Sequence, residues 1–254
     1  MLMNRVVPVL LLQDGLLVKT TRFKKPVYVG DPVNAVRIFN EKEVDEFVVL
    51  DMDPARGRGS IRMSLLEEIA SEAFMPVAYG GGIATAQAGR SLIELGFEKV
   101  VINSARTTAP RLIPDLVSVL GSQAVVGAVD FKSTRRGTEA YTHAGSRKLG
   151  RSASAAALDL VGLGVGEIFL NSVDRDGTMG GYDLRTIQEV AAAVDVPVLA
   201  CGGAGGPADL RAAVAAGASA VAAGSMFVFH GRHRAVLITY PDRQEIADLV
   251  APTR

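Results

Sequence analysis

Two stretches of the sequence carry paired glycines at matching positions. In each, an apolar run ends in two glycines, a helix-like run follows, and a second apolar run ends in serine: Gly81, Gly82 and Ser104 in one, Gly202, Gly203 and Ser225 in the other. Backbone N–H groups at such turns can hold a phosphate. Tight turns that only need the positive φ of glycine are the alternative, and the duplication favours phosphate binding. The sequence therefore predicts two phosphate sites.

Eight short apolar runs alternate with helix-like stretches along the chain. The expected strands are residues 5–12, 47–51, 76–79, 99–102, 124–130, 167–170, 196–200 and 218–222. Prolines at 32, 110 and 207 are interpreted as helix starts, and 60–71 and 85–95 have helical apolar spacing. Eight such units predict a single-domain (β/α)8 TIM barrel over 1–254, with half-barrels of approximately 1–120 and 121–254. A doubly wound open sheet is the structural alternative.

Composition narrows the class of protein. The 254 residues are 48% hydrophobic, enough for a large core, and 27 basic residues balance 27 acidic ones. This balance gives no overall attraction to nucleic acid or to an anionic membrane. The single cysteine allows no internal disulfide, and the apolar N-terminal run is too short for a membrane helix. We expect a cytoplasmic protein.

Polar residues at the carboxyl ends of the strands are the candidates for chemistry, because barrel active sites lie there. These residues are Asp51, Asn103, Asp130, Asn171, Gly224 and Ser225. A polar loop with Asp176 and Gly177 follows the sixth expected strand. Residues 13–31 are expected to form a long basic loop, either a substrate lid or a solvated charge run.

Six motifs stand in the order found in the cyclase (synthase) subunit of imidazole glycerol phosphate synthase. They are Gly80–Ile83, Ile102–Ala105, Gly121–Val126, Asp174–Thr178, Gly181–Asp183 and Gly202–Gly205. The sequence resembles that family over nearly its whole length. The resemblance implies a ligand with two phosphate ends, a separate glutaminase subunit docked on the opposite face, and passage of ammonia through the barrel. Lys19 matches a lysine of the family's substrate loop.

The family's reaction needs one aspartate at the end of strand 1 and another at the end of strand 5. Asp130 matches the second, but Leu11 occupies the first position. The internal repeat also aligns residues 6–11 with 125–130. This alignment uses this sequence alone and makes Leu11 the counterpart of Asp130. Leucine can neither donate nor accept a proton, and losing a positioned acid or base costs roughly 10²- to 10⁴-fold. Asp14 is the nearby candidate to replace it, although it stands in an expected turn.

Charged residues at strand starts match a ring that controls ammonia entry in the family: Arg5, Glu46, Lys99 and Glu167. Ordinary strand-start salt bridges are the alternative and contribute little. Charges pointing into a barrel mouth are costly unless paired, so four of alternating sign favour a functional ring.

Several residues have a purely structural interpretation. Asp130 could be a capping carboxylate rather than an acid, base or substrate anchor, and Asp176 could belong to a loop turn. The spacing of His143, His230, His233 and Cys201 does not indicate a metal site or a nucleophile. We expect neither a metal nor a cofactor.

Three functions compete. One is the cyclase/lyase of histidine biosynthesis, which Leu11 opposes. The favoured one is a divergent paralogue that conducts ammonia for sugar amidation in surface-polysaccharide biosynthesis, beside a glutaminase and a sugar amidotransferase. Such relatives resemble this chain at Leu10–Leu12 and Phe23–Pro32. A phosphosugar isomerase of the same superfamily ranks last, because it has no use for a charged gate.

Overall fold

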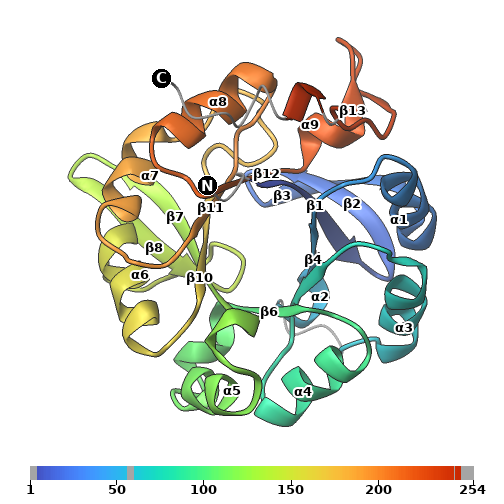
Figure 1. The fold of residues 1–254 in the computed structure, drawn as a ribbon. Coiled ribbons are helices and arrows are strands. Elements are labelled where there is room, and N and C mark those ends of the chain that lie inside the picture. Colours follow the sequence, from blue (N-terminus) through green and yellow to red (C-terminus); the bar gives the residue numbers. More distant parts are fainter. Residues whose placement is uncertain (1–4, 56–59, 243, 247–254) are drawn as a thin grey trace.

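The computed structural model describes residues 5–55, 60–242 and 244–246, and in this part eight parallel strands close into a barrel (Figure 1). Around the ring they are β1 (Arg5–Gln13), β4 (Phe47–Asp51), β5 (Val77–Gly80), β6 (Lys99–Ile102), β7 (Val125–Thr134), β10 (Glu167–Ser172), β11 (Val198–Cys201) and β12 (Ala220–Ala223). Each pairs in parallel with the next, and β12 pairs with β1. The expected single-domain (β/α)8 barrel is confirmed, and the open sheet is excluded.

Helices surround the strands (Figure 1). They are α1 (Pro32–Glu41), α2 (Met52–Ala55), α3 (Met63–Glu72), α4 (Ala86–Glu94), α5 (Leu112–Leu120), α6 (Ala153–Gly162), α7 (Leu184–Ala191), α8 (Pro207–Ala215) and α9 (Ser225–Val228), with 3-10 turns η1 (Ser104–Thr107) and η2 (Ser122–Ala124). The Asp31 side chain caps α1 by accepting from Asn34 N at 2.8 Å. Pro110 was wrongly expected to start a helix: Arg111 is the N-cap of α5, so Pro110 lies in the preceding turn.

Residues 13–31 form a hairpin rather than the expected loop. After a turn at Asp14 and Gly15, both with positive φ, β2 (Leu16–Thr21) pairs antiparallel with β1, and β3 (Lys24–Gly30) pairs with β2. Burial of Leu17 and Val18 drives this pairing, while the exposed lysines of β3 hid the strand in the sequence.

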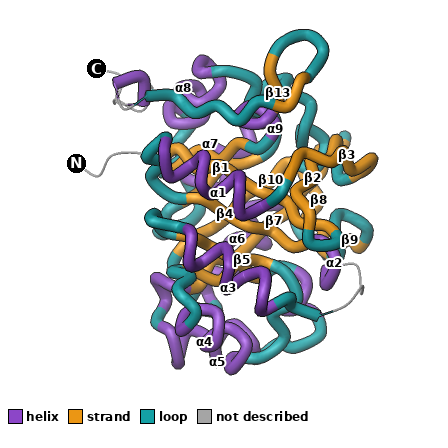
Figure 2. Tube along the Cα trace, turned by 90° about the vertical axis from the view of Figure 1, so that its right-hand side faces the viewer, coloured by secondary structure: helices purple, strands orange, loops and turns teal. Residues whose placement is uncertain are grey.

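A similar extension follows β7, the fifth barrel strand. β8 (Gly137–Thr142) pairs antiparallel with β7, and β9 (Arg147–Lys148) pairs with β8. Both extensions lie at one end of the barrel, with α2 (Figure 2). Their matching places after the first and fifth barrel strands are what a two-fold repeat requires, while the boundary near residue 120 stays a prediction. A third hairpin joins β13 (Phe229–His230) to β14 (Ala235–Val236).

Two apolar layers separate the inside of the barrel from its outside. The inner layer consists largely of valine and alanine around Phe169, which is almost fully buried. The outer layer joins the strands to the helices. Among the helices of the described residues, none is long and apolar enough to cross a membrane.

Gly127 lets α6 approach β7 closely. A Cβ built on Gly127 would lie 3.0 to 3.2 Å from three side-chain atoms of Leu160 on α6. Gly127→Ala should therefore overpack this contact and lower the free energy of unfolding by about 1–3 kcal/mol. Leu160→Ala alone should cost about 2–5 kcal/mol.

The double variant Gly127→Ala with Leu160→Ala tests whether the contact between residues 127 and 160 causes the loss of stability. Because the shortened side chain at 160 makes room for the added methyl, the two losses should sum to more than the loss in the double variant. Urea unfolding of the four proteins measures this coupling, and strict additivity would contradict the packing argument.

Candidate functional site

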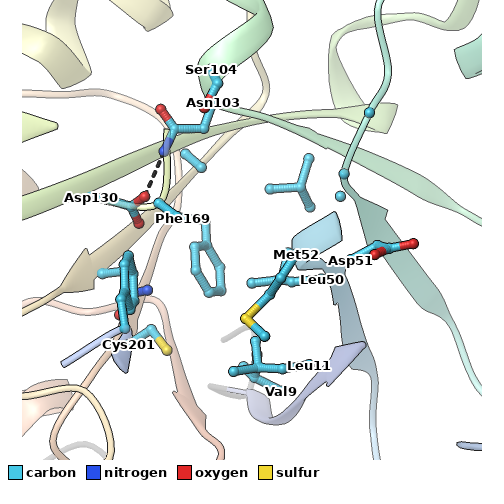
Figure 3. Close-up of a pocket in the computed structure, with 18 of the residues that line it drawn as sticks. Val9, Leu11, Leu50, Asp51, Met52, Asn103, Ser104, Asp130, Phe169 and Cys201 are labelled. Carbon is cyan, nitrogen blue, oxygen red and sulfur yellow. Dashed lines mark hydrogen bonds between the residues drawn. The ribbon is translucent and has the colours of Figure 1, made fainter. Parts of the chain in front are cut away.

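A cavity of about 1320 Å³ opens at the carboxyl ends of the barrel strands. Leu11 lines this cavity, and so does every residue predicted for substrate binding or catalysis. These predicted residues are Lys19, Asp51, Gly81, Gly82, Asn103, Ser104, Asp130, Asp176, Gly177, Gly202, Gly203, Gly224 and Ser225. In the view of Figure 3, Asp130 and Asn103 lie on one side of the Phe169 ring, and Leu11 lies with Val9 and Leu50 on the other. The structure thus brings the predicted residues together, while their roles stay predictions.

The two glycine units have the same local geometry. Gly81 has φ 136°, and a Cβ on it would lie 2.5 Å from the Asp51 carbonyl oxygen. Gly202 has φ 92°, and its Cβ would lie 2.6 Å from the Ser172 carbonyl oxygen. In both halves the glycine turn crosses the end of the preceding strand, where no side chain fits. Glycine is therefore required by the backbone itself, and phosphate binding needs separate support.

The serines that follow are placed differently in the two halves. Ser104 begins η1, and its Oγ accepts from the backbone N–H of His143 at 2.8 Å, so the loop after β8 reaches across to it. Ser225 begins the short helix α9 and is buried. A Cβ on the neighbouring Gly224 would lie 2.7 Å from Lys19 Nζ. A cation therefore stands beside the second glycine unit, as an anion site needs.

Asp130 is buried at the inner wall of the cavity. Its Oδ2 accepts from Asn103 Nδ2 at 2.7 Å. Loss of water and the nearby Asp176 carboxylate raise the pKa of Asp130 to about 7, although Asn171, Arg106 and Asn103 favour its charged form. A carboxyl group with this pKa can exchange a proton near neutral pH.

Lys19 and Asp176 are two further charged groups of the cavity wall, and they attract each other electrostatically. Burial lowers the pKa of Lys19 to about 8 against the attraction of Asp176, and its Nζ donates to the Val9 carbonyl. Asp176 accepts from Thr20 Oγ1 at 2.8 Å and from Phe23 N at 3.2 Å, and burial raises its pKa. These bonds fasten the β2–β3 hairpin to the loop that follows β10.

Asp51 lies at the end of β4 beneath the first glycine unit. Its Oδ1 accepts from the backbone N–H of Asp53 at 3.0 Å. Burial raises the pKa of Asp51.

Leu11 faces the cavity, whereas Asp14, the candidate to supply a carboxylate there, does not. Asp14 lies in the turn between β1 and β2, where its side chain is exposed and lies 3.8 Å from Arg62. It does not line the cavity. The acidic and lysine side chains of the described wall are therefore Asp51, Asp130, Asp176 and Lys19, and Leu11 adds no titratable group at the end of β1.

The four charged strand-start residues form a closed ring at the opposite end of the barrel. Arg5 bonds to both Glu46 and Glu167, and Lys99 Nζ lies 3.0 Å from Glu46 and 2.8 Å from Glu167. Each carboxylate thus holds both cations. Burial opposes the charge on Arg5, yet the two glutamates raise its pKa.

Comparison with known proteins agrees with this geometry. Residues 5–234 match the model of the family described as "Histidine biosynthesis protein". A Pseudomonas aeruginosa protein provisionally named imidazole glycerol phosphate synthase subunit hisF2 is 51% identical over 95% of this chain and 97% of its own length. The chain belongs to the histidine biosynthesis protein family.

Two further relatives place the chain within that family. A provisionally named subunit HisF of Leptospira interrogans is 43% identical over 96% of this chain and 98% of its own length. The imidazole glycerol phosphate synthase subunit HisF of Thermococcus gammatolerans is 39% identical over 89% and 90%. The predicted resemblance to a HisF-like paralogue is therefore confirmed.

Some residues of this HisF-like site escaped the sequence analysis. Asn171 was a strand-end candidate without a predicted role, and it lines the cavity with no hydrogen-bond partner for its Oδ1 among the described residues. Phe169 and His143 also line the cavity, but neither an apolar strand residue nor a loop histidine gives a signal in sequence. Burial raises the pKa of Cys201 far above its usual range. Among the described residues no cluster of histidine, cysteine and acidic groups is suited to a metal ion.

The raised pKa of Asp130 predicts a pH-dependent stability. Its folded pKa of about 7 exceeds the ordinary value of 3.8, so between these values the folded state binds more protons than the unfolded state. Stability should therefore fall as pH rises from about 4 to about 7, by at most about 1.4 kcal/mol per pH unit.

Asp130→Asn should remove this fall, so the variant should gain stability relative to the unmodified protein over that range. Urea unfolding from pH 4 to pH 8 measures the difference, with the exposed Asp195→Asn as control for charge loss. Parallel curves for the unmodified protein and Asp130→Asn would show that Asp130 titrates normally.

Proposed function

We propose that this chain is a HisF-like barrel that receives ammonia from a glutaminase subunit and conducts it to an acceptor, rather than one that closes an imidazole ring. The observation that carries the proposal is Leu11, which stands at the cavity where the internal repeat and the family both place a second aspartate. Asp14 is turned outward, and the cavity-lining neighbours of Leu11 in Figure 3, Val9 and Leu50, are apolar.

The ion ring supports entry of ammonia at the other end. Arg5, Glu46, Lys99 and Glu167 satisfy one another, so the two buried carboxylates are held across the barrel mouth by the two cations. A glutaminase docked below it would release ammonia directly against the ring, forming a heterodimer with this chain.

The barrel interior supports passage of a neutral molecule. Between the ring and the cavity lie Val7, Val48, Ala78, Val126, Ala220 and Ala222, all buried and apolar. Such a lining strongly disfavours an ammonium ion and tolerates neutral ammonia. A path with these two properties keeps ammonia unprotonated until it reaches the cavity.

The acceptor we propose is a sugar in surface-polysaccharide biosynthesis, amidated by a separate sugar amidotransferase in the cytoplasm. This chain resembles the paralogues that serve sugar amidation at Leu10–Leu12 and in the segment Phe23–Pro32, which contains β3 and the start of α1. A phosphorylated ligand in the cavity is compatible with this role, since Lys19 and both glycine units are in place.

The cyclase of histidine biosynthesis is the alternative function. Asp130 with a pKa of about 7, the two glycine units and the similarity to named HisF subunits favour it. Leu11 opposes it, because a reaction that needs an acid and a base on opposite sides of the cavity lacks one of them.

Nitrogen transfer tests the conduit. With the glutaminase, the acceptor enzyme and amide-labelled ¹⁵N-glutamine, the unmodified chain should deliver label to the sugar even when unlabelled ammonium salt is present. Lys99→Met leaves two buried glutamates with one cation and should cause ammonia to escape, so the labelled fraction should fall while glutamine hydrolysis continues. Arg90→Met, which breaks the exposed pair with Glu94, is the control.

An unchanged labelled fraction in Lys99→Met would contradict the gate. Turnover of the family's ribulosyl ligand with ammonium salt at rates usual for HisF subunits would instead establish the cyclase.

Leu11→Asp tests why cyclisation is absent. A carboxylate opposite Asp130 should give measurable cyclase activity where the unmodified chain has little or none, because an acid–base partner contributes roughly 10²- to 10⁴-fold. Leu50→Asp, which places a carboxylate at the neighbouring cavity position, should not. Ligand binding is measured by calorimetry in parallel, and a bound ligand without any gain would show that Leu11 is not what blocks the reaction.

A further inference from the structure

Two hairpins near the cavity mouth expose apolar side chains. Val27 and Tyr28 on β3 are 53% and 60% exposed, and Val236 and Leu237 at β14 are 48% and 53% exposed. We call the exposed residues 24–28 and 230–237 the rim surface. Exposed apolar side chains gathered in this way mark interaction sites.

The rim surface is also basic. Residues 22–28 and 230–237 include Arg22, Lys24, Lys25, Arg232 and Arg234 and contain no aspartate or glutamate, although acidic and basic residues balance in the whole chain. The loop beneath carries two acidic side chains: Asp174 accepts from Ser133 N, and Asp176 accepts from Thr20 and Phe23. The two segments themselves carry five lysine and arginine side chains and no acidic one.

Both hairpins are fastened to the loop that lines the cavity. Arg22 N donates to the Asp176 carbonyl at 2.9 Å, and an Arg234 Nη donates to the Gly177 carbonyl at 3.0 Å. Asp176 and Gly177 themselves line the cavity. In Figure 1 the hairpins occupy the same sector, beside β1 and β12. The rim surface is thus part of one wall of the mouth, at the end away from the ion ring.

The surface is poorly suited to a second copy of this chain. In the described structure β3 is an edge strand that pairs with β2 alone, and Pro26 lacks the N–H that strand addition needs. Lys24 and Lys25 would face like charges in a symmetric pair. Charge complementarity instead selects an acidic protein surface with an apolar centre.

We propose that the rim surface docks the enzyme that consumes the ammonia, which covers the cavity mouth while it is bound. This inference rests on the proposed function, because it assigns the exit of the conduit. Ammonia that leaves an open mouth enters water and is lost by protonation and dilution. A partner held by Tyr28 and Leu237 would close that route.

Binding of the purified sugar amidotransferase of the source organism tests the proposal. With that enzyme immobilised and no glutamine present, Tyr28→Ser combined with Leu237→Ser should raise the Kd about tenfold or more, as for central apolar contacts. Lys24→Glu combined with Lys25→Glu should slow association and weaken its salt dependence.

Leu158→Ser and Arg185→Glu are the matched controls, since both side chains are exposed on outer helices and should leave the Kd unchanged. Urea unfolding confirms that each variant folds. Unchanged Kd values in both rim variants would overturn the proposal. It would also be overturned if the substitutions instead abolished binding of this chain to phosphatidylserine-rich vesicles, or its self-association measured by sedimentation.

The two proposals fail separately. Unaltered docking with no label transferred from glutamine would contradict the conduit, whereas normal label transfer with rim variants that dock normally would contradict the rim surface.

Discussion

Closure of the barrel around paired charges is the constraint on which the rest of the structure depends. Eight parallel strands bring Arg5, Glu46, Lys99 and Glu167 to one rim, where each ion contacts both neighbours of opposite sign. An isolated buried charge would cost several kcal/mol, so the ring is tolerated only because it is complete. This completeness fixes the relative positions of β1, β6 and β10 and seals the apolar interior from one side.

The cavity at the other end obeys a different rule, because its charges are incompletely compensated. Asp130 and Asp176 share one wall, and burial raises the pKa of both. Lys19 attracts the Asp176 carboxylate, but the pKa of Lys19 falls to about 8 because its ammonium group is also desolvated. Buried groups with shifted pKa values of this kind cluster at sites where a ligand binds or a reaction takes place. The ring at the other end has all of its charges paired.

Much of this could be predicted from the sequence, for physical reasons. Parallel barrel strands are buried on both faces, so their continuous apolar runs revealed all eight to within a few residues, and polar residues at their ends converge in any closed barrel. The hairpin at 16–30 was missed because its outer strand is solvated and lysine-rich. The outward turn of Asp14 and the place of Phe169 depend on tertiary packing, which local pattern does not encode. The glycine turns were predicted, although the backbone requires them with or without phosphate.

In the proposed function, the two ends of the barrel have different roles. A cyclase needs both the ring and a pair of proton-transfer groups across the cavity, whereas a conduit needs the ring and an exit. Replacing the whole ring by apolar side chains would serve the fold as well, so stability alone does not require the four charges. The ring is complete, whereas Leu11 and Asp130 line opposite sides of the cavity. A complete ring at one end and a leucine beside the cavity at the other are what the proposed conduit requires, because ammonia would pass through without reacting in the barrel.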